Sequence, residues 1–171
     1  MKLQKILVPL DGSALAEAAL PKALEMAESS GAKLLLMRAA EARTLPGVDP
    51  TESQIRVVRE AEDYLARVDD RLAALGQTNV ETSVWYGPAA YAIVEAARLN
   101  KVDLIAMTTH GRSGLGRLIL GSVAESVLRG TTTPILLIRV AEAPVQAPLE
   151  KGEAKPWVAA RGRREGTAHV A

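Results

Sequence analysis

The sequence of 171 residues has no cysteine, no phenylalanine and only two histidines. The absence of cysteine excludes disulfides, thiolate zinc sites, iron–sulfur clusters and cysteine nucleophiles. His110 and His169 are too few for a multi-histidine metal centre within one chain. Because aromatic residues make up only 3% of the chain, the hydrophobic core must consist mainly of Leu, Val, Ile and Ala.

An excess of one charge and long apolar runs are also absent. Lys and Arg total 21 against 20 Asp and Glu, a balance that does not favour a nucleic-acid binder. The basic cluster Arg161 to Arg164 is short, and a solvated tail explains it better than a nucleic-acid contact does. The first apolar run, Ile6 to Leu10, is too short for a signal peptide, and no run reaches the ~18 residues that cross a membrane. We therefore expect a cytoplasmic protein.

Short apolar runs alternate with amphipathic segments along the first 140 residues. Runs without polar interruption are typical of strands that are buried on both faces. The predicted strands are Lys5 to Leu10, Lys33 to Arg38, Val80 to Tyr86, Leu104 to Met107 and Ile135 to Val140. The predicted helices are Ala14 to Ser29, a long helix from Thr51 that ends at Gly76, Ala89 to Leu99, and Ser122 to Arg129.

Five local signals refine these helices. Ser13 is a candidate N-cap, and Pro21 predicts a kink or a restart because proline removes one helical hydrogen bond. Thr51 and Gln54 have the spacing of a capping box, and Gly76 is suited to a C-terminal cap. Pro88 is expected in the first turn of its helix.

The alternation predicts the α/β fold class, because parallel strands need crossover helices that pack back on the sheet. We expect an open, doubly wound, five-stranded parallel sheet in the order 3-2-1-4-5, with helices on both faces. This domain should span residues 1–140. Residues 141–171 lose the periodicity and contain Pro144, Pro148 and Pro156, so we expect a disordered or loosely packed tail.

Two loops are candidates for a binding site. In open α/β sheets, ligands bind beyond the carboxyl ends of the strands, where the strand order reverses. Pro9 to Ser13 follow the first predicted strand, and Thr108 to Arg117 follow the fourth. If these two strands are neighbours, both loops face one crevice.

The second loop is rich in glycine and precedes a predicted helix. Glycines allow backbone amides to approach an anion, and a helix N-terminus adds free N–H donors. The groups that would suit a phosphate are Gly111, Gly114, Gly116, Gly121, Ser122, Arg112 and Arg117. A flexible loop with Ser122 serving only as a helix cap explains the same residues.

The spacing in this loop resembles a family signature. Gly111, nine further residues and Gly121-Ser122 resemble the nucleotide-binding signature of the universal stress protein family (UspA-like), Gly-x2-Gly-x9-Gly-Ser/Thr, with Thr108 in place of the first glycine. Ile6 to Ser13 resemble the family's first strand and acidic turn, and Gly121 to Leu128 resemble its last helix. The resemblance covers residues 3 to 140.

The resemblance implies a site for ATP or AMP. Adenosine would contact Pro9, Asp11 and Ala39, and the phosphates would contact Gly111, Gly121, Ser122 and Val123. Neighbouring positions complete the predicted site: Met107, Thr108, His110 and Arg112. Asp11 would accept a hydrogen bond from ribose or bind Mg²⁺. Asp before Gly is also a common turn former, which is the alternative explanation for Asp11.

Three functions remain open. We expect an ATP-binding regulatory stress protein with slow or no hydrolysis, because no acid–base pair stands out. His110 then positions a ligand by hydrogen bonding, and Glu125 is a solvated helix residue. The alternatives are a slow ATPase or phosphotransferase that uses the same crevice, and a stress protein in which Thr108 prevents nucleotide binding. The sequence contains no Walker A motif, no dinucleotide fingerprint and no hydrolase elbow.

The last predicted strand indicates a partner. Ile135 to Val140 would form an apolar edge whose unpaired backbone favours association. We expect a homodimer through this edge, as the resemblance also implies, and an unidentified protein partner that responds to the bound nucleotide. A tail from Ala141 onward that covers the edge is the alternative.

Overall fold

The computed structural model describes residues 2–42, 49–109 and 121–140. In chain order, the elements are β1 (Lys5–Pro9), α1 (Ala14–Glu17), α2 (Leu20–Ser30), β2 (Lys33–Ala40), α3 (Thr51–Ala74), β3 (Val80–Tyr86), α4 (Ala89–Leu99), β4 (Leu104–Thr109), α5 (Ser122–Gly130) and β5 (Ile135–Arg139). The predicted tail after Val140 and the loop residues His110 to Leu120 lie outside the described ranges.

The five strands form one parallel sheet in the order β3-β2-β1-β4-β5. This arrangement confirms the predicted fold class and strand order. The order reverses between β1 and β4, because the chain first moves outward through β2 and β3 and then returns to the other side of β1. Pro9 lies opposite Met37 at the last β1–β2 pair, whereas β2 and β3 stay paired as far as Ala40 and Tyr86.

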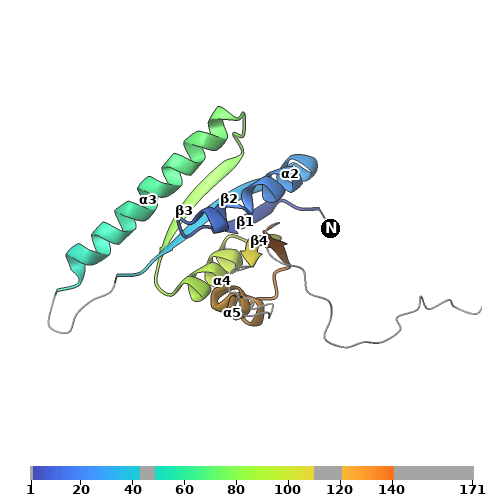
Figure 1. Cartoon of the computed structure of the whole chain (residues 1–171). Coiled ribbons are helices and arrows are strands. Elements are labelled where there is room, and N and C mark those ends of the chain that lie inside the picture. Colours follow the sequence, from blue (N-terminus) through green and yellow to red (C-terminus); the bar gives the residue numbers. More distant parts are fainter. Residues whose placement is uncertain (1, 43–48, 110–120, 141–171) are drawn as a thin grey trace, which may run out of the picture.

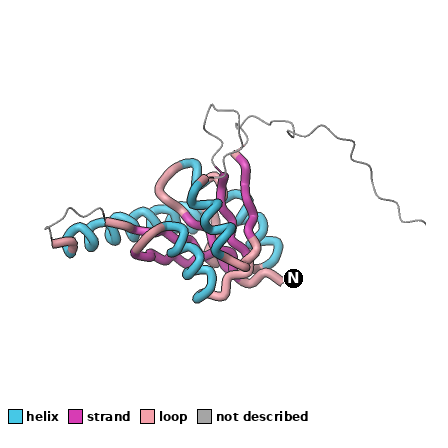
Figure 2. Tube along the Cα trace, turned by 90° about the horizontal axis from the view of Figure 1, so that it is seen from below, coloured by secondary structure: helices cyan, strands magenta, loops and turns pink. Residues whose placement is uncertain are grey.

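Helices cover both faces of the sheet, as predicted. In Figure 1, α2 and α3 lie on one side of the strands and α4 and α5 lie on the other. Viewed from below, helices lie both in front of and behind the strands (Figure 2). Side chains alternate along each strand, so Ile6 and Val8 pack towards α2 and α3, and Leu7 packs towards α4 and α5. The buried core is aliphatic except for Tyr64 on α3.

Pro21 divides the first predicted helix into two. Ser13 is the N-cap of α1, and its Oγ accepts a hydrogen bond from the Ala16 N–H at 3.1 Å. Helix α1 ends at Glu17 and α2 begins at Leu20, which places Pro21 in the first turn of α2. A proline there loses no helical hydrogen bond, because the first N–H groups of a helix have no partner within it. The predicted restart is confirmed.

The predicted capping box at Thr51 is wrong, whereas the predicted cap at Gly76 is confirmed. Thr51 is already the first residue of α3, and Asp49 Oδ1 accepts hydrogen bonds from its N–H at 2.9 Å and from its Oγ1 at 2.7 Å. The Asp49 carboxylate thus binds the N–H and hydroxyl groups of Thr51 that the capping box would have used. At the other end, Gly76 has a φ of +85° and its N–H donates to the Ala73 C=O at 2.9 Å.

Smaller differences concern the ends of other elements. Pro88 is the N-cap of α4 and not part of its first turn. Strand β4 continues past Met107 to Thr109, and β2 continues past Arg38 to Ala40. Within the described residues, no helix is long and apolar enough to cross a membrane.

Candidate functional site

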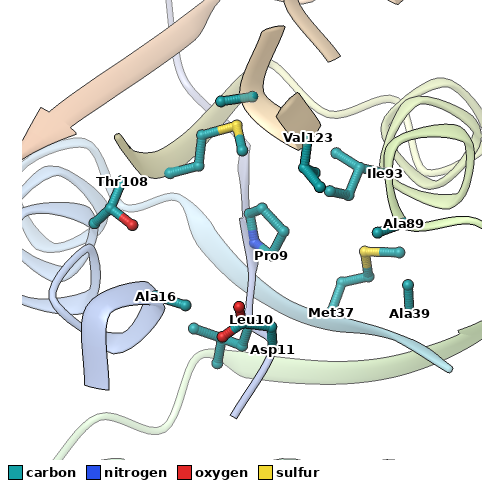
Figure 3. A pocket seen from close by; sticks show the side chains of 12 residues that line it. Pro9, Leu10, Asp11, Ala16, Met37, Ala39, Ala89, Ile93, Thr108 and Val123 are labelled. Atoms are coloured by element: carbon teal, nitrogen blue, oxygen red, sulfur yellow. The ribbon is translucent and has the colours of Figure 1, made fainter. Parts of the chain in front are cut away.

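A pocket lies at the carboxyl ends of β1, β2 and β4, next to the first turns of α4 and α5. Its empty space is about 640 Å³, which includes space open to solvent. The lining side chains are shown in Figure 3: Pro9, Leu10, Asp11, Ala16, Met37, Ala39, Ala89, Ile93, Met107, Thr108, Val123 and Ala124. Most of them are apolar, and Asp11 and Thr108 supply the polar side-chain atoms. The pocket is at the position where the strand order reverses, as the sequence predicted.

The turn after β1 brings Asp11 to the pocket. The Leu10 N–H donates to the Met37 C=O at 2.8 Å, and the chain then leaves the sheet. Asp11 Oδ1 accepts a hydrogen bond from the Ser13 N–H at 2.9 Å, and Gly12 has a φ of +89°, which favours glycine. Asp11 therefore forms the turn, as expected from the alternative explanation that Asp before Gly is a turn former. Its second oxygen, Oδ2, has no hydrogen-bond partner among the described residues and is free to meet a ligand.

The end of β2 exposes main-chain groups at the pocket. Backbone N–H and C=O groups alternate in direction along a strand, and the Met37 C=O points towards β1, where it accepts from the Leu10 N–H. The N–H and C=O groups of Ala39 also point towards the side of β1. At that level β1 has already ended, because its chain turns away from the sheet at Asp11. The Ala40 C=O points the other way and accepts from the Gly87 N–H at 2.9 Å. Ala39 thus presents one donor and one acceptor at the edge of the pocket.

The start of α5 forms another wall. Gly121 is the N-cap, Ser122 is the first helical residue, and no side-chain cap is formed. The alternative in which Ser122 serves as the helix cap is therefore wrong, because the extended Gly121 (φ −54°, ψ 145°) occupies that position instead. The first intrahelical bond runs from the Glu125 N–H to the Gly121 C=O at 2.9 Å, which leaves the N–H groups before it without a helical acceptor.

The structure brings most of the predicted site residues together. Those that line the pocket are Pro9, Asp11, Ala39, Met107, Thr108 and Val123. Gly121 and Ser122 do not line it but directly precede Val123. His110, Gly111 and Arg112 lie outside the described residues. The roles of all these residues stay predictions.

Sequence reasoning missed several lining residues. They are Leu10, Ala16, Met37, Ala89, Ile93 and Ala124. Ala89 carried a usable signal, since it follows the Gly87-Pro88 turn at the carboxyl end of a predicted strand. Ile93 carried none, because its position depends on how α4 packs against the sheet.

The charges around the pocket are few. Asp11 is the one ionisable side chain among the described lining residues. No cluster of three or more His, Cys, Asp or Glu residues suited to a metal occurs among residues 2–42, 49–109 and 121–140. Glu125 is exposed and pairs with Arg129 at 2.8 Å, in agreement with the prediction of a solvated helix residue.

Comparison with known proteins decides the family. The model of the universal stress protein family matches residues 2–139. The chain belongs to this family. A universal stress protein from Methanocaldococcus jannaschii is 30% identical over 141 residues, which cover 80% of this chain and 82% of that protein.

Solved structures of universal stress proteins have the same fold. The universal stress protein UspA from Lactobacillus plantarum is 26% identical, with a TM-score of 0.69 over 81% of this chain and 99% of that chain. A universal stress protein solved in complex with cAMP is also 26% identical, with a TM-score of 0.64 over 81% of this chain and 98% of that one. At least one protein similar to this chain therefore binds a nucleotide.

Proposed function

We propose that this universal stress protein is a regulatory nucleotide binder whose ligand is ATP or AMP and which hydrolyses ATP slowly or not at all. The observation that carries the proposal is the pocket at the strand-order reversal, where Asp11, the main chain of Ala39 and the first turn of α5 surround one space. Nucleotide binding by the relative in complex with cAMP supports the ligand class.

The apolar end of the pocket suits the base. Met37, Ala39, Ala89 and Ile93 form a surface on which a flat ring can pack (Figure 3). The free C=O and N–H of Ala39 match the exocyclic amine and the adjacent ring nitrogen of adenine, one a donor and the other an acceptor. This pairing favours adenine, because guanine presents a carbonyl and a ring N–H at the corresponding atoms.

The polar side of the pocket suits ribose and phosphate. Asp11 Oδ2 would accept a hydrogen bond from a ribose hydroxyl. The first N–H groups of α5, with the Ser122 hydroxyl and the predicted donors Gly111 and Arg112, would bind phosphate oxygens. Asp11 is also the residue that would supply a carboxylate oxygen to Mg²⁺, with phosphate and water completing the shell. Thr108 would contact the ligand at the end of β4.

The chemistry of the described lining residues supports slow turnover. Among the described residues that line the pocket, the only side chain that can accept a proton from water at neutral pH is Asp11, and its Oδ1 already holds the turn. Bound nucleotide would therefore act as a regulatory ligand, and a protein partner would recognise the nucleotide-bound form. Product formation from ATP and Mg²⁺ at more than a few turnovers per hour would favour the ATPase or phosphotransferase alternative.

We also infer that β5 forms a homodimer edge. Ile135, Leu136 and Ile138 are partly buried, and Leu137 retains 36% of its surface exposure. The opposite edge, β3, carries the polar Glu81, Thr82 and Ser83 and is less suited to association. Light scattering should report a dimer for the full chain and a monomer for Leu137→Lys. A monomeric parent protein would contradict this inference.

The assignments of residues 141–171 as a tail and of the protein to the cytoplasm remain proposals. Removal of the residues after Val140 should leave the nucleotide affinity and the dimer unchanged if the domain ends at residue 140. A loss of either property would place part of the tail in the functional unit.

Calorimetric titration of the purified full chain with ATP, AMP and GTP tests the nucleotide proposal. We expect ATP or AMP to bind and GTP to bind more weakly. Asp11→Ala should weaken binding by about tenfold, the effect of losing one charge-assisted hydrogen bond. Asp70→Ala, which removes an exposed carboxylate on α3, is the matched control and should bind like the parent.

Two results would contradict the proposal. One is the absence of ATP and AMP binding to the full chain, together with no nucleotide released from acid-precipitated protein; this supports the alternative of a stress protein without a nucleotide. The other is an unchanged affinity of Asp11→Ala, which places the ligand elsewhere.

A further inference from the structure

Tyr64 of α3 brings a hydroxyl to a core that is otherwise aliphatic. It is the only aromatic residue among the buried residues that the structure describes. Removing a hydroxyl from water costs free energy unless the hydroxyl finds a hydrogen-bond partner. The Tyr64 hydroxyl donates to Glu17 Oε1 of α1 at 2.8 Å, and the Arg38 guanidinium carbon lies 4.8 Å from the centre of the Tyr64 ring. The ring is therefore held on one side and its hydroxyl is directed at α1.

Glu17, the last residue of α1, bonds to α3 through both carboxylate oxygens. Arg71 donates to Glu17 Oε2 at 2.7 Å. Tyr64 and Arg71 are seven residues apart, so they lie on the same face of α3. Burial raises the pKa of Glu17, but hydrogen bonds from Arg71 and Tyr64 outweigh this effect and hold it below the ordinary value of 4.5. Glu17 is therefore ionised at neutral pH, as an acceptor of both bonds must be.

Helix α1 depends on such an anchor because it is short. It has only four residues, none of which is buried, and Glu17 is its only polar side chain. A single helical turn is not stable by itself in water, so its position depends on tertiary contacts. Ala16 packs partly against the core, and Glu17 supplies the polar contact with α3.

The same short helix forms the wall of the pocket beside Asp11. Ala16 lines the pocket, and Figure 3 shows it on the side where Asp11 lies. The Ala16 N–H donates to Ser13 Oγ at 3.1 Å, and the Ser13 N–H donates to Asp11 Oδ1 at 2.9 Å. These two bonds, with the peptide that joins Ala16 to Glu17, link the Asp11 carboxylate to the anchor on α3.

We propose that Glu17 is a positioning residue for nucleotide binding, because its bonds to Tyr64 and Arg71 hold α1 and the Asp11 turn in the geometry that meets a ribose hydroxyl. This inference rests on the proposed function, since it requires a ribose at Asp11. Glu17 does not line the pocket, so it acts through α1. Without the anchor, the turn would sample more positions, and the Asp11 carboxylate would spend less time where a hydroxyl can donate to it.

Calorimetric titration of the full chain with AMP and ATP, and with their 2′,3′-dideoxy counterparts, tests the proposal. The ratio of the two affinities measures what the ribose hydroxyls contribute. The parent protein should prefer the ligand with hydroxyls about tenfold, the gain typical of one charge-assisted hydrogen bond. Glu17→Ala should reduce this preference about fivefold, an effect within the range of residues that act on a ligand without touching it. Its affinity for the dideoxy ligand should stay close to that of the parent.

Conservative variants separate the two bonds of Glu17. Glu17→Gln keeps an oxygen for the Tyr64 hydroxyl but loses the charge that meets Arg71, and should keep part of the preference. Tyr64→Phe removes only the hydroxyl and should lower the preference in the same direction. Because both changes act on one contact, Tyr64→Phe combined with Glu17→Ala should lower the preference no further than Glu17→Ala alone.

Glu81→Ala is the matched control, because Glu81 also holds two cationic partners, Lys5 and Lys33, but at the amino ends of the strands. It should leave the preference unchanged. A ratio of affinities within one variant is insensitive to a loss of stability. If Glu17→Ala lowers the melting temperature and keeps the full preference, Glu17 has a structural role only, and this inference alone is overturned. Equal binding of both ligands by the parent protein would also remove Asp11 from the ribose, and failure of AMP and ATP to bind would overturn the proposed function itself.

Discussion

The two ends of the parallel sheet differ in how their polar groups are used. At the amino ends of the strands, polar groups bond to one another. Asp103 Oδ2 accepts from the backbone N–H groups of Gln4 at 2.7 Å and Lys5 at 2.9 Å, and Glu81 pairs with Lys33 at 2.7 Å and Lys5 at 3.2 Å.

At the carboxyl ends, several polar groups have no partner among the described residues. They include one oxygen of Asp11, the guanidinium of Arg38, and the hydroxyls of Thr108 and Ser122. No fully buried side-chain polar atom of the described residues lacks a hydrogen bond, so these groups are unpaired where solvent or a ligand can reach them. The difference indicates that the amino end contributes to stability and the carboxyl end is available for binding.

The largest effect is expected at the carboxyl end. Ala39→Trp places an indole in the apolar part of the pocket, where the proposed base would lie. Affinity for ATP and AMP should fall by at least about 100-fold, because the substituted side chain fills the space a ligand needs. Calorimetric titration measures this loss, and a melting temperature close to that of the parent serves as the control. An unchanged affinity would show that the nucleotide does not bind in this pocket.

An intermediate effect is expected at the amino end. Asp103→Ala leaves the N–H groups of Gln4 and Lys5 without their acceptor and should lower the free energy of unfolding by about 2 kcal/mol. Urea denaturation measures the change, with Asp70→Ala as a surface control. Nucleotide affinity should stay at the parent value; a parallel loss of affinity would show that the two ends are not independent.

The smallest effect concerns pH. Hydrogen bonds from Lys33 and Lys5 lower the pKa of the Glu81 carboxyl below its ordinary value of 4.5. Glu81 is ionised in the folded state to lower pH than in the unfolded state, so its stabilising contribution is complete above about pH 4.5 and is lost as the pH falls through the lowered value.

Glu81→Gln should therefore lower the free energy of unfolding at pH 7 by less than about 1 kcal/mol, because the pair is exposed and screened. The difference from the parent protein should shrink as the pH falls below 4 in the same urea experiment. A difference that grows on acidification would contradict this assignment.

The fold was predictable from local signals that tertiary structure left unchanged. The apolar runs at β1 and β2, the restart at Pro21 and the cap at Gly76 each act within a few residues. The prediction at Thr51 was wrong because two local side chains compete there, and Asp49 engages the Thr51 groups first. Spacing alone does not decide which acceptor prevails.

The pocket was predictable in part. Residues that end a strand, such as Asp11, Ala39 and Thr108, could be placed at one edge of a parallel sheet. Ile93 and Ala16 could not, since their positions depend on how α4 and α1 pack. The contact of Arg38 with the Tyr64 ring carried no signal, because the two residues are distant in the sequence.

By itself, the sequence determined the alternation of strands and helices and the ends of the sheet that carry loops, because hydrophobic period and turn chemistry are local properties. The tertiary structure decided which polar groups find partners. That outcome depends on distances between residues far apart in the chain, as where the packing of α3 against β2 places Tyr64 beside Arg38.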